Sequence, residues 1–183
     1  MRVIAGTAKG KQLKMVPGEG TRPVSDRVKE AAFNILTYDT PDSRFLDLFA
    51  GTGAVGIEAL SRGAAHATFV EKAAQAVRVV RENLRATGLT AQATVIHGDA
   101  FEFLRKTDQQ FDIIYIAPPQ YLGLWAKAMR ALDERPILSA EGVIVVQIFP
   151  KEFEPLDLQH YTLTDRRTYG STMLCFYRYG ATN

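Results

Sequence analysis

The sequence predicts an α/β fold in which helices flank a mostly parallel sheet. Between residues 44 and 148, apolar segments of strand length alternate with longer segments of helical periodicity. This alternation is typical of βαβ units, whose strands lie parallel in one sheet. Two further strand-like segments follow without a helix between them, within residues 161–178. They predict an antiparallel element at the end of the sheet.

The first 40 residues are predicted to extend this sheet domain. Residues 2–15 should form two short strands around a turn, and Ser25 or Asp26 should cap a helix that runs through Leu36. Up to Glu30 there are seven basic and three acidic residues, a surplus of four positive charges against two for the whole chain. We expect a basic face that attracts phosphates, although a solvated surface hairpin would carry the same charge.

The remaining elements follow in order along the chain. Strands are expected at residues 44–48, 68–71, 93–96, 111–116 and 143–148, and a final strand pair should meet near residues 170–171. Helices are expected at residues 54–62, 73–87, 101–104 and 122–132, and Gly63 and Gly88 should end the first two. Residues 1–183 are predicted to form a single domain, with residues 1–40 as an extension and residues 41–183 as the core.

Composition excludes several classes of protein. The hydrophobic fraction of 46% and the charged fraction of 23% are those of an ordinary globular chain, not a disordered one. Cys175 is the single cysteine, so no disulfide can form within the chain, and the three histidines lack metal-ligand spacing. We expect no metal, no membrane span and no signal peptide, hence a cytoplasmic protein without a membrane partner. No motif requires a second subunit, so a monomer is expected.

A glycine-rich loop between the first core strand and its helix carries the clearest chemical signal. Gly51, Gly53 and Gly56 form a G-x-G-x-x-G pattern, which allows a tight turn and the close approach of a ligand. Asp47 and Phe49 precede it and make the loop acidic and aromatic. Negative charge would repel the pyrophosphate of a dinucleotide but suits a ligand with an ammonium and a sulfonium group. The loop therefore favours S-adenosylmethionine over NAD, although a structural turn without a ligand would use the same glycines.

Acidic residues end the next two strands. Glu71 lies about 20 residues after the loop, where an acid would accept hydrogen bonds from ribose hydroxyls, and a solvated glutamate is the alternative. Asp99 could face an adenine ring, cap the following helix, or do both. The predicted cofactor-binding residues are Asp47, Phe49, Gly51, Thr52, Gly53, Glu71, Lys72, Asp99 and Ala100.

A short proline-containing loop follows the fourth core strand. Two consecutive prolines make it rigid at the edge where open α/β sheets bind ligands. Proline has no N–H, so carbonyls here stay free to orient an amino group that accepts a methyl, although a plain turn would look the same. The predicted catalytic residues are Ala117, Pro118, Pro119, Gln120 and Tyr121.

Together these motifs resemble the class I methyltransferases, which have a Rossmann-like sheet. More closely, the chain resembles RsmD, the bacterial 16S ribosomal RNA guanine-N2 methyltransferase family, over nearly its whole length. Residues 2–11 (RVIAGTAKGK) are similar to that family's N-terminal hairpin, and residues 21–30 (TRPVSDRVKE) match its most distinctive stretch. Residues 46–53 (LDLFAGTG) and 56–64 (GIEALSRGA) match its cofactor loop and the helix that follows.

The resemblance implies transfer of a methyl group from S-adenosylmethionine to the exocyclic N2 amine of a guanine in 16S ribosomal RNA, as naked RNA or in a 30S assembly particle. It places Arg22, Asp26 and Arg27 near the substrate, although Arg22 could instead form an ordinary salt bridge. Lys9 and Lys11 are candidates for contacts with the RNA backbone. These five residues are the predicted substrate-binding set.

One motif departs from the family pattern of Asp-Pro-Pro followed by Tyr or Phe. Here Ala117 replaces the acid, Gln120 takes the aromatic position and Tyr121 follows one residue later. We hypothesise that the carbonyls of Ala117 and Pro118, aided by the Gln120 amide, hold the amine while Tyr121 stacks on the base. Ala117 keeps open an RNA- and cofactor-binding module without turnover, for which cofactor would bind without methyl transfer. A methyltransferase for DNA or a small molecule is the other alternative.

Overall fold

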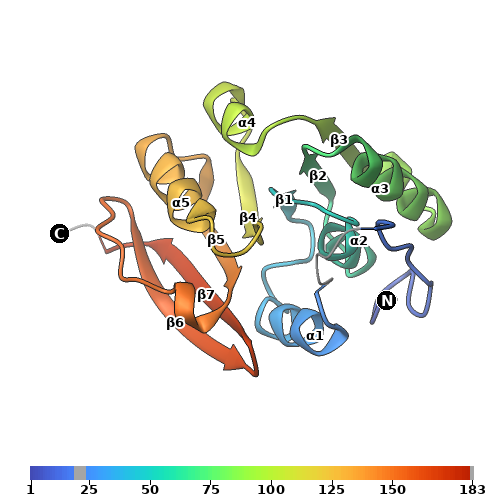
Figure 1. Cartoon of the computed structure of the whole chain (residues 1–183), viewed down its shortest axis with the longest axis horizontal. Coiled ribbons are helices and arrows are strands. Elements are labelled where there is room, and N and C mark those ends of the chain that lie inside the picture. The colour runs from blue at the N-terminus through green and yellow to red at the C-terminus, as the bar shows by residue number, and fades with distance from the viewer. Residues whose placement is uncertain (19–23, 182–183) are drawn as a thin grey trace.

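The computed structural model describes residues 1–18 and 24–181, and a seven-stranded sheet forms its centre (Figure 1). The strand order is β3-β2-β1-β4-β5-β7-β6. Five neighbouring strands run parallel, and β7 pairs antiparallel with both β5 and β6. The strands are β1 (Arg44–Asp47), β2 (His66–Glu71), β3 (Ala93–His97), β4 (Phe111–Ile116), β5 (Leu138–Ile148), β6 (Tyr161–Tyr169) and β7 (Thr172–Tyr179).

Helices cover both faces of this sheet. They are α1 (Asp26–Ile35), α2 (Ala54–Ser61), α3 (Ala74–Thr87), α4 (Ala100–Lys106) and α5 (Leu124–Glu134), with 3-10 turns at Thr90–Gln92 and Pro150–Glu152. Alternate residues of each strand point to opposite faces, so Phe45 packs with α1, α2 and α3 while Leu46 packs with α4 and α5. Burial on both faces explains why the parallel strands are almost continuously apolar. None of the helices in the described parts of the chain is long and apolar enough to cross a membrane.

The predicted order of core strands and helices is confirmed, and β5 departs most from its expected length. β5 begins at Leu138, five residues before the apolar segment that predicted it. Its first residues include the polar Ser139 and Glu141 and fall where the β4–β5 register shifts, between the pairs Phe111–Leu138 and Ile113–Val143. Polar residues on a strand next to a bulge hide its start from an analysis based on hydrophobicity.

The two strands predicted in residues 2–15 are present as an antiparallel hairpin with a single bridge, between Arg2 and Gln12, and are shorter than expected. The Val3 N–H donates to the Lys11 carbonyl and the Leu13 N–H to the Met1 carbonyl, both at 3.0 Å, while the residues of the turn bond to α2. The Ser61 carbonyl and hydroxyl accept the N–H groups of Thr7 and Ala8 at 2.8 and 2.9 Å. Gly6 has φ +89°, and a Cβ there would lie 1.8 Å from the Ser61 carbonyl oxygen. The segment is therefore a short hairpin loop whose turn is fitted against α2.

A largely buried ion cluster joins this loop to α1 and α2. The Glu58 carboxylate lies 3.2 Å from the Lys29 ammonium and 2.9 Å from Arg62 Nε, and Lys29 and Glu58 are both 0% exposed. Lys29 also donates to the Arg2 carbonyl at 2.6 Å, while Glu58 accepts the N–H of Ile4 at 2.8 Å. Because each buried charge has an opposite charge and hydrogen-bond partners, the cluster can fix the loop without leaving a charge uncompensated.

Candidate active site at the carboxyl edge of the sheet

The strand order reverses at β1 and β4, which are parallel neighbours. From β1 the chain builds outward through β2 and β3 on one side, and β4 and β5 lie on the other. Ligands of open α/β sheets bind at such a switch point, beyond the carboxyl ends of the strands. The loop after β1 (residues 48–53, the cofactor loop) and the loop after β4 (residues 117–121, the acceptor loop) therefore leave the same edge side by side (Figure 1).

The cofactor loop turns sharply on its glycines and is fixed to its neighbours. Gly51 and Gly53 have φ values of +56° and +82°, in the left-handed region that favours glycine. Gly56 serves a different purpose, because a Cβ there would lie 2.3 Å from the buried ring of Phe69 and would prevent α2 from packing against β2. The Ala50 N–H donates to the Val70 carbonyl at 3.0 Å. The loop is thus shaped before any ligand arrives.

Asp47 lies beneath this loop and is only 2% exposed. Its carboxylate accepts the N–H of Gly56 at 3.0 Å. Burial, together with the charge of Glu71, raises the pKa of Asp47 to about 7. A cation above the loop would favour the ionised form, so Asp47 can act on a ligand through its charge without direct contact.

Glu71 stands at the mouth of the cofactor loop, at the end of β2. One carboxylate oxygen accepts the Gly51 N–H at 2.7 Å and the other accepts the Ala73 N–H at 2.9 Å. An ionised carboxylate has about four acceptor positions, so ribose hydroxyls can still donate to it. The exposed Lys72 follows, and its carbonyl lies 3.1 Å from His97 Nε2.

Asp99 caps α4, as one of its two interpretations predicts. Its Oδ1 accepts the N–H groups of Phe101 and Glu102 at 2.9 and 3.0 Å. The contact with an adenine ring stays a prediction. Ala100 is buried, and the ring of Phe49 meets that of Phe101 edge-on at 6.2 Å. These side chains form an aromatic wall beside the cofactor loop.

The acceptor loop is far more open. Ala117 and Pro118 are half-buried, while the residues from Pro119 to Tyr121 are exposed. Among the described residues, no backbone N–H bonds to the carbonyl of Ala117 or Pro118. Both acceptors are therefore available, as the catalytic hypothesis requires.

Tyr121 adopts an unusual conformation that two other residues support. Its φ is +61°, its N–H donates to Glu152 at 2.8 Å, and its ring stacks on Phe149 with centroids 5.1 Å apart. The second Glu152 oxygen accepts the Phe149 N–H at 3.1 Å. The sequence analysis missed Phe149 and Glu152, although their position directly after β5, at the same edge of the sheet, could have indicated them.

The predicted substrate-binding residues lie on the N-terminal segment and on α1. Lys9, Lys11 and Arg27 are exposed. Asp26 lies 3.6 Å from Arg2 Nε, so it forms an ion pair. Arg22 lies outside the described residues. Contact of these side chains with RNA stays a prediction.

Asn83, a buried residue that the sequence analysis also missed, ties the N-terminal segment to the cofactor loop. Its side-chain amide donates to the Thr52 carbonyl at 2.9 Å and to the Lys14 carbonyl at 3.1 Å, and its oxygen accepts the Lys14 N–H at 2.7 Å. In residues 1–18 and 24–181, no group of three or more His, Cys, Asp or Glu side chains is placed to hold a metal ion.

Comparison with known proteins assigns the chain to a family. The family model described as Conserved hypothetical protein 95 matches residues 1–178. The ribosomal RNA small subunit methyltransferase D of Haemophilus influenzae is 35% identical over 173 residues, which cover 93% of this chain and 89% of that protein. The chain belongs to the ribosomal RNA small subunit methyltransferase D family. The resemblance carried by the motifs is thereby confirmed.

Solved structures agree with membership of the ribosomal RNA small subunit methyltransferase D family. The yhhF protein of Escherichia coli superposes with a TM-score of 0.88 at 32% identity and covers 100% of this chain and 99% of its own. A hypothetical protein of Thermus thermophilus has a TM-score of 0.83 at 35% identity, with coverage of 97% and 99%. The expected class I methyltransferase architecture, parallel with an antiparallel end, is confirmed.

Proposed function

We propose that the protein transfers a methyl group from S-adenosylmethionine to the exocyclic N2 amine of a guanine in small-subunit ribosomal RNA. The observation that supports this most is the juxtaposition of the cofactor loop and the acceptor loop at one switch point. It occurs in a chain whose relatives are ribosomal RNA methyltransferases. One loop can hold the methyl donor while the other holds the amine.

The chemistry of the cofactor loop fits this donor. Asp47 places negative charge beneath the loop, which suits a ligand with an ammonium and a sulfonium group. Gly51 and Gly53 leave space for a ligand to approach the backbone, and Glu71 presents a carboxylate where a ribose would lie. When bound, S-adenosylmethionine supplies the methyl group as an electrophile.

The acceptor loop orients the amine. The carbonyls of Ala117 and Pro118, with the Gln120 amide, would accept N–H hydrogen bonds and aim the nitrogen lone pair at the methyl carbon. As the N–C bond forms, the S–C bond breaks and the amine passes its extra proton to water. Positioning of this kind is worth up to about 7–11 kcal/mol in ideal intramolecular reactions. The guanine must leave its stack to reach the loop, where Tyr121 offers a ring.

Ala117 supports a second candidate, a module that binds RNA and S-adenosylmethionine without turnover. Its methyl side chain cannot accept the hydrogen bond that the family's acid would accept, so turnover would depend on the backbone carbonyls and the Gln120 amide. The two candidates share the same cofactor loop and differ only in the chemical step.

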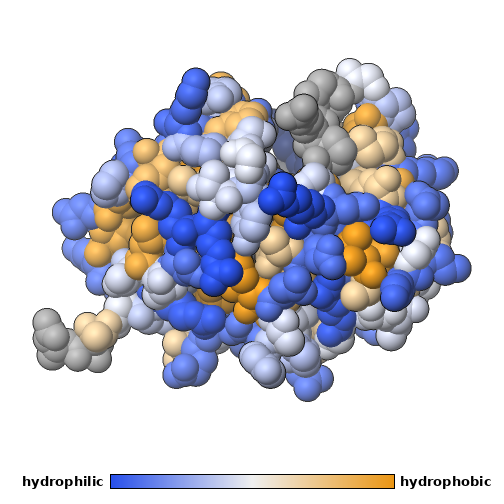
Figure 2. All heavy atoms as spheres, turned by 90° about the horizontal axis from the view of Figure 1, so that it is seen from below, coloured by the Kyte–Doolittle hydropathy of each residue, from blue (hydrophilic) through white to orange (hydrophobic). Residues whose placement is uncertain are grey.

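We further propose that the protein acts as a monomer in the cytoplasm, on free ribosomal RNA or on a 30S assembly particle. The four large apolar side chains exposed among the described residues are Met15, Tyr38, Tyr121 and Leu122, which lie in separate parts of the chain except for the last pair. The face in Figure 2 is mainly hydrophilic, with apolar residues in small patches. A stable dimer generally needs a larger apolar surface.

The test is transfer of labelled methyl from S-adenosylmethionine to small-subunit ribosomal RNA, supplied naked and in 30S particles that lack their native modification. We expect label at a guanine N2, identified by nuclease digestion and mass spectrometry. Cofactor binding without label would favour the binding module. Label on DNA or on another base would contradict the proposed substrate.

A further inference from the structure

The end of β6 lies at the same edge of the sheet as the acceptor loop. β5 and β6 each pair antiparallel with β7, so β6 runs in the direction of β4 and β5. Across the sheet Ile116 pairs with Val146, Val146 with Cys175, and Cys175 with Arg166. Arg166 is therefore level with the last residue of β4, and the chain from there to Tyr169 extends beyond the carboxyl edge.

This end of β6 also faces the same side of the sheet as Ala117. Both Ala117 and Tyr169 pack against the core cluster that contains α1 and α2 residues. Three strand spacings separate β4 from β6, which corresponds to about 14 Å between backbones. A single-stranded RNA of a few nucleotides can span that separation.

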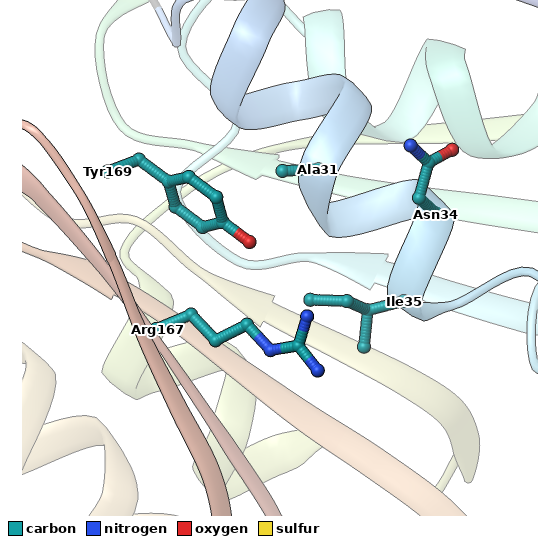
Figure 3. Close-up of a pocket in the computed structure, with 5 residues that line it drawn as sticks. All are labelled: Ala31, Asn34, Ile35, Arg167 and Tyr169. Atoms are coloured by element: carbon teal, nitrogen blue, oxygen red, sulfur yellow. The ribbon is translucent and has the colours of Figure 1, made fainter.

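A surface pocket of about 450 Å³ lies between α1 and this end of β6. It is lined by Ala31, Asn34 and Ile35 of α1 and by Arg167 and Tyr169 of β6. Figure 3 shows that Arg167 and Tyr169 reach from the strand toward the helix. The guanidinium of Arg167 lies near Ile35, and Asn34 lies farther away on α1. The volume is within the range of small-ligand pockets, about 300–1,000 Å³.

The groups in the pocket are those that bind single-stranded RNA. The Arg167 side chain is 53% exposed, and its Nε pairs with Asp165 at 3.0 Å. The terminal nitrogens of a guanidinium can still donate to a phosphate in a planar, two-pronged geometry. Tyr169 adds an aromatic ring on which a base can stack, and RNA is commonly recognised by stacking of unpaired bases.

The pocket continues onto the predicted substrate-binding surface. Arg27, Ala31 and Asn34 follow the i, i+4, i+7 spacing of one face of α1. Arg27 is exposed, so a strand of RNA that leaves the pocket along this face meets a second cation. Arg167 and Arg27 thus offer two cations along one surface, which runs from the pocket over this face of α1.

We propose that this pocket binds a nucleotide that flanks the target guanine, with its phosphate on Arg167 and its base against Tyr169. The proposal rests on the proposed function, because it takes the same RNA as ligand. It adds a contact that holds the RNA while the guanine is turned into the acceptor loop.

Arg166 provides a matched control. It is adjacent to Arg167 and has the same charge, but it points to the other face of the sheet, where its guanidinium lies 4.5 Å from the Phe153 ring centroid. Arg167→Ala should weaken binding of a small-subunit ribosomal RNA fragment about tenfold and reduce the slope of log affinity against log salt by about 1. Tyr169→Ala should weaken it about fivefold or more. Arg166→Ala should stay within about twofold of the wild type.

Asn34→Asp tests the opposite wall of the pocket. The substitution adds negative charge on an exposed helix position, so we expect weaker RNA binding without loss of folding. Affinity for S-adenosylmethionine and the thermal midpoint serve as folding controls for each variant. These measurements are made by fluorescence anisotropy and calorimetry on the full chain.

The outcomes separate this proposal from the proposed function. If the wild type methylates the RNA but Arg167→Ala and Tyr169→Ala bind it as Arg166→Ala does, the pocket is not an RNA subsite and the function stands. If the wild type binds RNA without methylating it and the pocket variants weaken that binding, the function fails and the subsite stands.

Discussion

The cofactor loop and the acceptor loop leave the same edge of the sheet but are held in different ways. Residues 48–53 are bonded to β2 and β4, to Glu71 and to Asn83, over the buried carboxylate of Asp47. Residues 117–121 are largely exposed, with the Glu152 contact and the ring stack on Phe149 at their end. The site for the methyl donor is preformed, whereas the site for the RNA base keeps its polar groups free for the substrate.

Tyr121 shows what this openness requires. A residue other than glycine in the left-handed region costs of order 1–3 kcal/mol and persists where other contacts hold it. Glu152 supplies that contact through its bond to the Tyr121 N–H, and Phe149 gives the ring a surface to rest on. An incoming base can add to the two rings that already stack. The acceptor loop is thus strained and supported from the segment after β5, while the cofactor loop is built on glycine.

The largest expected effect is on stability and concerns the buried ion pair between Lys29 and Glu58. Glu58→Ala leaves the fully buried Lys29 ammonium without its counter-charge, which typically lowers the free energy of unfolding by about 3–5 kcal/mol. Urea denaturation followed by circular dichroism measures the change. Glu102→Ala is the control, because it removes an exposed ion pair with Lys106 and should scarcely shift the midpoint. Equal shifts for the two variants would contradict the importance of the buried cluster.

The next effect tests whether the acceptor loop contributes to RNA binding without contributing to cofactor binding. Tyr121→Ala removes the stacking surface, so the KM for RNA should rise by a factor that corresponds to about 1–3 kcal/mol, while the Kd for S-adenosylmethionine stays unchanged. Steady-state methylation kinetics and calorimetry measure the two quantities. Leu122→Ala, at the exposed neighbouring position, should leave the KM unchanged. A similar rise in both variants would show that the loop acts through its general apolar character and not through the Tyr121 ring.

Much of the fold could be predicted from the sequence because its signals are local. Continuous apolar strands, helical periodicity and the stop at Gly88 located most elements of the core, and Ser25 caps α1 as proposed. The hairpin proposed within residues 2–15 forms only one bridge, because Glu58 and Ser61, more than 50 residues away, take the N–H groups of its turn. A local pattern cannot reveal such a competitor.

The candidate site divides in the same way. Asp47 and Glu71 could be recognised because they end strands and Asp99 because it closely follows one, and the structure places all three around one edge. Asn83 could not, because it acts through a contact with a distant backbone group at Thr52. Glu152 could be placed at this edge, but its contact with Tyr121 could not be foreseen. Sequence spacing identifies residues that face a ligand more readily than residues that hold those residues in place.

A pH experiment tests whether Asp47 serves the cofactor loop through its charge. The pKa of Asp47 is about 7 in the folded protein and lies above the usual value of 3.8, so the Asp47 carboxyl is ionised in only part of the folded molecules near neutral pH. If only molecules with an ionised Asp47 bind S-adenosylmethionine, their fraction rises about tenfold between pH 6 and pH 8, and the apparent Kd for the cofactor falls by the same factor. Calorimetry in buffers of different ionisation enthalpy should also detect proton release. Asp47→Asn can keep the bond to Gly56 and should lose this pH dependence, and an equal dependence in both proteins would contradict the role.

The smallest expected effect asks whether the acceptor loop works through its backbone. Ala117→Asp restores the acid of the family pattern, and replacing neutral acceptors by a charged one should gain about 1 kcal/mol, or roughly fivefold in kcat. Gln120→Ala should lower kcat by a similar factor if its amide helps to hold the amine. Single-turnover methylation of the same RNA separates this chemical step from product release. A gain of several orders of magnitude on adding the acid would show that the carbonyls of Ala117 and Pro118 contribute little, and the native protein would then be closer to the RNA-binding module than to an efficient enzyme.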